Sequence, residues 1–187
     1  MDLPWGEDRT KQFATNVGLI TSNGPNGNDI MACEWTFHVS YSPGLIAVCI
    51  HRPDATHENI EKTKEFGVNL AASDQNTLSS ISGGYHGTQY NKVEALKELG
   101  YKFFKAKKID VMMVEGAAMN AECKLFKKIE LGDHTMFVGE VVELYQAGKK
   151  PIVYHAGKYW KLENQIQKPT QEERDKIREV VDKFKKN

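Results

Sequence analysis

The apolar residues of this chain fall into short runs separated by turn-forming residues, a pattern typical of β-strands joined by hairpins. Residues 45–50 are apolar without alternation, which predicts a strand buried on both faces. Residues 13–21 and 30–35 flank a dense signal of Asn, Gly and Pro residues, so we expect them to pair as a hairpin. The first third of the chain is therefore predicted to be mainly β-structure.

The second half of the chain repeats this pattern with longer runs. Residues 121–131 and 136–145 are separated by Gly132-Asp133-His134, which predicts one long hairpin. Residues 151–155 and 159–162 predict a short final hairpin around Ala156-Gly157. Two more short strands are predicted at residues 68–71 and 111–115.

Helical periodicity is confined to short segments, at residues 56–66, 73–81, 91–100 and 170–186, and residues 82–87 are expected to form a loop. Gly67 stands where the first helix is expected to be capped. Asn91 with Glu94, and Thr170 with Glu173, are typical capping boxes at the starts of later helices. The last helix carries one apolar stripe, which we expect to pack on the rest of the fold or on a second subunit: Ile177, Val180, Val181 and Phe184.

The order of these elements restricts the fold class. Six or more strands follow one another in hairpin order, and the helices do not alternate regularly with them. A doubly wound parallel sheet is therefore not expected, whereas a closed or nearly closed antiparallel barrel with peripheral helices fits. We predict a mainly β (α+β) protein with a single domain over residues 1–187, a barrel at about 10–162 and a C-terminal helix at about 170–186.

Composition and charge exclude several classes of partner. The chain has 25 Lys and Arg residues and 25 Asp and Glu residues, so no single-sign field favours nucleic acid or an anionic membrane. No run has the length of a membrane span, and the N-terminus lacks the apolar core of a signal peptide. Cys33, Cys49 and Cys123 are widely spaced, which is typical of buried reduced thiols. We therefore expect a cytoplasmic protein.

Common catalytic signatures are missing from the sequence. It contains no GxGxxG, GxxxxGK[ST] or GxSxG motif, and the six His residues are too scattered to predict a metal site. The predicted strand 45–50 is instead followed by His51, Arg52 and a helix start at Thr56. An imidazole, a guanidinium and a helix N-terminus that lie close together can bind an anion. The plain alternative is an ordinary strand-loop-helix connection with solvated charges.

The order of the segments resembles the flavin reductase-like family of FMN-binding split-barrel proteins, and most of all its flavoredoxins. The resemblance spans about residues 10–162. It is carried by a set of short pieces in the family's order, namely Asn28, Ala32 and Trp35; Ser40 and Pro43; Thr56, Asn59 and Ile60; Glu65-Phe66 with Val68-Asn69; Ser82-Gly83; Asn91-Lys92; Glu122-Cys123 with Leu125; and Gly132-Asp133-His134 with Gly139-Glu140-Val141.

The resemblance implies a six-stranded antiparallel split barrel, a homodimer, and FMN near the subunit interface. It also implies positions for the flavin. The ring region is assigned to Asn28 and Trp35, to backbone groups around Cys33, Glu34, Cys49 and Ile50, and to Tyr159 or Trp160; the phosphate is assigned to Arg52, Thr56 and Asn59, with Ser82 and Lys92 closing over it. His134 is the expected catalytic residue, where it approaches the flavin or the incoming donor.

The function implied is an FMN-dependent oxidoreductase that moves electrons from NADH, NADPH or a redox-protein donor to an acceptor. The flavin supplies the redox chemistry, and the protein supplies binding, orientation and potential. Two alternatives remain open from the sequence: a non-catalytic FMN-binding protein that carries electrons or stores flavin, and an interaction protein that kept the barrel and lost the pocket.

Overall fold

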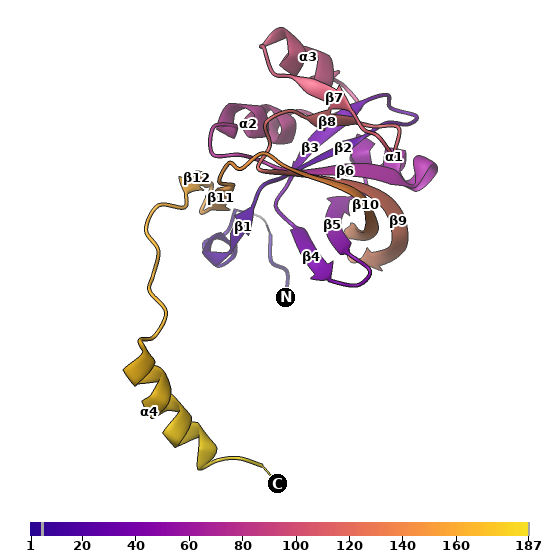
Figure 1. Ribbon diagram of the computed structural model, residues 1–187. Coiled ribbons are helices and arrows are strands. Elements are labelled where there is room, and N and C mark those ends of the chain that lie inside the picture. Colours follow the sequence, from indigo (N-terminus) through magenta and orange to yellow (C-terminus); the bar gives the residue numbers. More distant parts are fainter. Residues whose placement is uncertain (5, 187) are drawn as a thin grey trace.

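The computed structural model describes residues 1–4 and 6–186, and Figure 1 shows its arrangement. Its helical segments are η1 (Thr10–Gln12), α1 (Ala55–Thr63), α2 (Asn76–Gly84), α3 (Lys92–Glu98) and α4 (Gln171–Asp182). Its strands are β1 (Ala14–Asn16), β2 (Gly18–Ser22), β3 (Asp29–Cys33), β4 (Thr36–Ser40), β5 (Leu45–His51), β6 (Glu65–Leu70), β7 (Phe103–Lys105), β8 (Met112–Val114), β9 (Met119–Leu131), β10 (His134–Gln146), β11 (Ile152–His155) and β12 (Lys158–Lys161).

The main sheet is antiparallel and curls into a nearly closed barrel. Its strand order is β3-β2-β6-β9-β10-β5-β4, so β3 and β4 form its two edges. These edge strands follow each other in the chain, because β3 ends at Cys33 and β4 begins at Thr36. The sheet must therefore bend until its edges meet, and the amide of Cys49 on β5 donates to the carbonyl of Trp35 at this junction (3.0 Å). The predicted mainly β fold with a barrel is confirmed.

The main sheet has seven strands where the resemblance implied six. The difference comes from residues 36–40, which the sequence did not mark as a strand because three of the five side chains are exposed and mixed in polarity. These residues nevertheless pair with β5, from Thr36 opposite Val48 to Ser40 opposite Leu45. The hairpins β2-β3, β9-β10 and β11-β12 form as predicted. The first predicted strand is split at Val17, since β1 pairs with β11 in a separate three-stranded sheet.

The barrel interior is filled by apolar side chains from six strands and α1. Phe66, Phe137, Ile20, Ile50 and Ile60 are fully buried there. The continuous apolar run 45–50 supplies this interior through Ile46, Val48 and Ile50, as its pattern predicted. A second buried cluster joins the outside of β2 and β3 to α2 and α3. These two clusters fix α1, α2 and α3 around one end of β3.

Two helix boundaries differ from the sequence prediction. Helix α1 ends at Thr63, and Lys64 takes the left-handed cap conformation (φ 62°) that we expected Gly67 to provide. Gly67 lies inside β6, where a Cβ would stand 2.3 Å from Thr21 Oγ1 and 2.5 Å from Met113 Sδ, so close packing requires the glycine. Helix α2 begins at Asn76 rather than at residue 73, and it continues to Gly84 through part of the expected loop.

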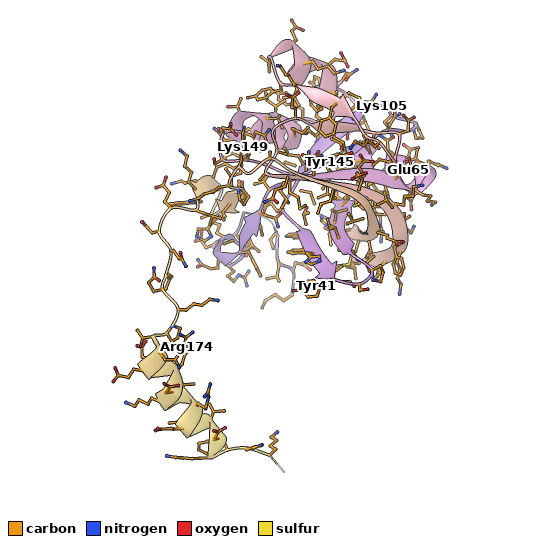
Figure 2. All side chains as sticks on the ribbon, viewed as in Figure 1. Tyr41, Glu65, Lys105, Tyr145, Lys149 and Arg174 are labelled. Carbon is orange, nitrogen blue, oxygen red and sulfur yellow. The ribbon has the colours of Figure 1, made fainter. Side chains whose placement is uncertain are left out.

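Helix α4 begins with the predicted capping box of Thr170 and Glu173. It projects away from the barrel, and its Arg174 lies far from the other labelled side chains in Figure 2. The apolar stripe is exposed, from 48% at Val180 to 78% at Phe184, so its expected burial does not occur within the chain. Among the described helices, none is both long and apolar enough to cross a membrane.

Candidate functional site

A pocket of about 200 Å³ lies where β3, the start of α1, the end of α2 and the start of α3 meet. Three residues that the sequence assigned to the cofactor, Thr56, Ser82 and Lys92, take part in its lining. The complete lining comprises Asp29, Met31, Ala32, Asp54, Ala55, Thr56, Ser82, Gly83, Tyr85, His86, Gly87 and Lys92. The structure therefore brings together predicted residues that are up to 36 positions apart, from Thr56 to Lys92.

The polar centre of this pocket is a buried ion pair between Asp29 and Lys92. The Lys92 Nζ atom lies 3.2 Å from Asp29 Oδ1, and the two side chains are 4% and 3% exposed. The hydroxyl of Thr56 donates to Asp29 Oδ2 (2.6 Å), and Lys92 Nζ also reaches the carbonyl of Ser82 (3.4 Å). Because a buried charge is costly unless it is paired and hydrogen-bonded, Thr56 and Lys92 together stabilise the carboxylate.

Asp29 was missed by the sequence reasoning, which selected its neighbour Asn28. The Asn28 side chain is exposed, whereas Asp29 is the first residue of β3 and is buried. A carboxylate that opens an otherwise apolar strand, DIMAC, is the signal that could have found it, because such a residue needs a buried partner.

Arg52 points away from this pocket. Its Nη2 atom donates to the carbonyl of Gly132 (2.8 Å) and lies 3.0 Å from Glu130 Oε2, while half of the side chain remains exposed. These contacts tie the loop after β5 to the turn between β9 and β10. The structure thus separates Arg52 from Thr56, with which the sequence had grouped it.

Asn59 has a supporting position behind the pocket. It is fully buried, and its amide group donates to the carbonyl of Gly27 (2.9 Å) and to Ser22 Oγ (3.1 Å). Its Oδ1 atom accepts from the backbone amide of Asn26 (3.0 Å). Asn59 therefore fixes the turn that leads into β3, and so it positions Asp29.

An aromatic cluster lies at the other end of β3. The ring centroids of Trp35 and His134 are 4.7 Å apart, and those of His51 and His134 are 5.2 Å apart. His134 is the first residue of β10, directly opposite His51 of β5. Its Nδ1 atom lies 2.7 Å from Asp133 Oδ1, which orients the ring. Trp35 remains 44% exposed, so this cluster presents an aromatic wall to the outside.

The other predicted ring contacts are less direct. Cys33 and Ile50 point into the barrel core, so only their backbone groups are left for a ligand, as the sequence interpretation supposed. Burial raises the pKa of the Cys33 thiol to about 12, which leaves it protonated at neutral pH. Cys49 is partly exposed, and Trp160 donates from Nε1 to the carbonyl of His155 within its own hairpin (3.1 Å). Trp160 is absent from the described lining of the pocket.

Comparison with known proteins identifies the family. Residues 10–163 match the family described as "Flavin reductase like domain". This chain belongs to that flavin reductase-like family. An uncharacterised protein of Archaeoglobus fulgidus is 31% identical over 141 residues, which cover 73% of this chain and 77% of that protein. The "FMN reductase (NADH) RutF" of Pseudomonas syringae pv. syringae is 25% identical over 156 residues, covering 83% and 84% of the two chains.

Solved structures agree with this family. The structure titled "Flavin reductase PheA2 in native state" superposes with a TM-score of 0.73 at 26% identity, covering 88% of this chain and all of that one. The family resemblance, the mainly β fold and a flavin reductase-like oxidoreductase function, all expected from the sequence, are confirmed. The roles of individual site residues stay predictions, which the geometry above makes more specific.

Proposed function

We propose that this flavin reductase-like protein takes a hydride from a nicotinamide nucleotide onto bound flavin and passes the electrons to an acceptor. The observation that carries the proposal is that β3 joins two different surfaces. One is the polar pocket around Asp29 and Lys92, and the other is the aromatic wall of Trp35 and His134. A flavin has the matching parts, an apolar ring system and a polar side chain, so it fits a site with one surface of each kind.

The spacing of the two surfaces suits an elongated ligand. Asp29 and Trp35 are six positions apart in the chain, which allows a separation of up to roughly 20 Å. Met31 and Ala32 line the pocket between them. We assign the ribityl part to the pocket and the ring to the aromatic wall. Glu34 precedes Trp35 in the chain, and Cys49 and Ile50 precede His51, so we assign these three residues to the ring as well.

His134 is the residue we assign to positioning the hydride donor. When Nδ1–H donates a hydrogen bond to the Asp133 carboxylate (2.7 Å), Nε2 is left as an acceptor, which can orient an amide such as that of a nicotinamide. The rings of Trp35 and His51 both lie against the His134 ring and help to hold it in place. Bound flavin supplies the two-electron acceptor; the protein residues bind and orient the reactants.

The identity of the flavin, its electron donor and the oligomeric state are parts of the same proposal. We assign FMN as the flavin and NADH or NADPH as donor, which is supported by the relative named FMN reductase (NADH). The terminal phosphate is assigned to Arg52, whose half-exposed side chain has to leave Gly132 and Glu130 and turn toward Asp54 to reach it. A homodimer is supported by exposed side chains on β4 and directly after it, because Phe37, Val39 and Tyr41 are 44–92% exposed in the single chain.

The test is a visible absorption spectrum of the purified protein with FMN, repeated after anaerobic addition of NADH and then NADPH. We expect a flavin band that bleaches with at least one nucleotide. A band that bleaches only with dithionite identifies a flavin-binding carrier, and the absence of any band after added FMN refutes the flavin site. His134→Asn is expected to slow bleaching at least ten-fold, whereas the exposed His38→Asn serves as the matched control and leaves the rate unchanged.

A further inference from the structure

The charge of the pocket is unusual for a site that holds a phosphate. Among the described residues in its lining, Lys92 is the sole Lys or Arg, and its charge is already matched by Asp29 at 3.2 Å. Asp54 adds a second carboxylate, and His86 is the other titratable imidazole or amine there. The pocket therefore lacks the net positive charge that favours a phosphate dianion.

The hydrogen bonding of Asp29 indicates which ligand group the pocket lacks. Asp29 Oδ2 accepts from Thr56, but Oδ1 is buried without a hydrogen-bond partner, since Lys92 Nζ is near it without suitable hydrogen-bond geometry. A buried acceptor left unpaired is destabilising, so a ligand that donates a hydrogen bond here would be favoured. A phosphate dianion offers acceptors alone, whereas a hydroxyl offers a donor and an acceptor.

The surrounding backbone keeps this acceptor in place. The loop after α2 packs directly on the carboxylate, because a Cβ on Gly87 would stand 2.3 Å from Asp29 Oδ1. Thr56 holds the second oxygen through a hydrogen bond of 2.6 Å. The carboxylate therefore cannot turn freely toward another partner within the chain.

We propose that Asp29 and Lys92 form a hydroxyl-recognition pair, which reads the ribityl hydroxyls of the flavin rather than its phosphate. Asp29 Oδ1 accepts from a ligand hydroxyl, and Lys92 donates to the same or the adjacent hydroxyl oxygen. The assignment rests on the proposed function and adds that this pocket holds riboflavin and FMN alike. Discrimination between the two flavins comes from groups outside it.

The test compares dissociation constants for riboflavin and FMN, measured by quenching of flavin fluorescence, in the full-length protein and three variants. Asp29→Asn and Lys92→Gln are each expected to weaken binding of both flavins by about ten-fold and to leave the ratio of the two constants unchanged. Asp74→Asn removes an exposed carboxylate that pairs with Lys149 outside this lining, and it is the matched control, with riboflavin and FMN binding unaffected.

A selective effect on FMN overturns the assignment. If Lys92→Gln weakens FMN and not riboflavin, Lys92 is a phosphate ligand; if Asp29→Asn tightens FMN alone, Asp29 acts by repelling a phosphate. Thermal melts check that the variants fold. If Asp29→Asn does not fold, the ratio of the riboflavin and FMN dissociation constants of Lys92→Gln is the deciding result. If the wild-type protein binds neither flavin, both the proposed function and this assignment are refuted. If it binds both flavins but the variants do not weaken the two equally, this assignment alone is refuted.

Discussion

The hydrogen bond from Thr56 to Asp29 is a single contact whose removal has a calculable cost. Thr56 is fully buried on the first turn of α1, and its hydroxyl lies 2.6 Å from Asp29 Oδ2. Thr56→Val keeps the branched shape and leaves the carboxylate with Lys92 as its remaining charged neighbour. A hydrogen bond to a charged group contributes about 1.5–3 kcal/mol, so the free energy of unfolding should fall by that amount. For a chain of 187 residues, this corresponds to a decrease in Tm of roughly 3–12 °C.

The assay is thermal and urea unfolding followed by circular dichroism, with Thr63→Val as the matched control. Thr63 lies on the same helix, but its hydroxyl donates to the neutral carbonyl of Asn59 (3.0 Å) and its side chain is exposed. Its replacement should therefore change stability by less than about 0.5 kcal/mol. Equal effects of the two substitutions would refute the view that Asp29 is a buried carboxylate that depends on Thr56.

Three further predictions concern charges. Glu122 is buried, which opposes its ionisation, but hydrogen bonds from Tyr145 (2.6 Å) and from the amides of Lys107 and Lys108 outweigh this and hold its pKa below the usual value. Its stabilisation is thus present above about pH 4.5 and lost as pH falls further, so Glu122→Gln should lower stability at pH 7 by about 3 kcal/mol and flatten acid unfolding curves. Burial lowers the pKa of His57, so stability should fall as pH drops below about 6.5, and His57→Gln should reduce that slope in urea titrations. Arg52→Ala should weaken FMN binding about five- to ten-fold in fluorescence titrations and leave riboflavin binding unchanged, whereas an equal loss for both flavins would place the phosphate elsewhere.

Much of the fold follows from patterns that local physics determines. The unbroken apolar run 45–50 has to be buried on both sides, and it is the strand that lines the barrel. Turn residues between apolar runs placed three hairpins correctly, because chain reversal needs residues of that kind. Strand β4 was not predicted because its exposed residues pair with β5 through backbone groups, and backbone pairing leaves no trace in side-chain polarity.

The site residues show the same division between local and long-range causes. Ser82 and Lys92 reach the pocket because helix starts and ends are encoded locally, through Asn91 accepting from the amide of Glu94, for example. Arg52 is drawn away from the pocket by Glu130, which lies 78 positions further along the chain, and no local pattern announces that partner.

Asp29 illustrates why an acidic residue can be overlooked in a site expected to bind an anion. From sequence, a search for a phosphate site selects Arg, Lys and hydroxyl residues and passes over a carboxylate. The folded chain places that carboxylate between Lys92 and Thr56, so the same cation that suggested a phosphate ligand is already neutralised. What a site selects is therefore set by the balance of its buried charges. Here that balance favours a hydrogen-bond donor, and the polyhydroxyl part of a flavin provides one.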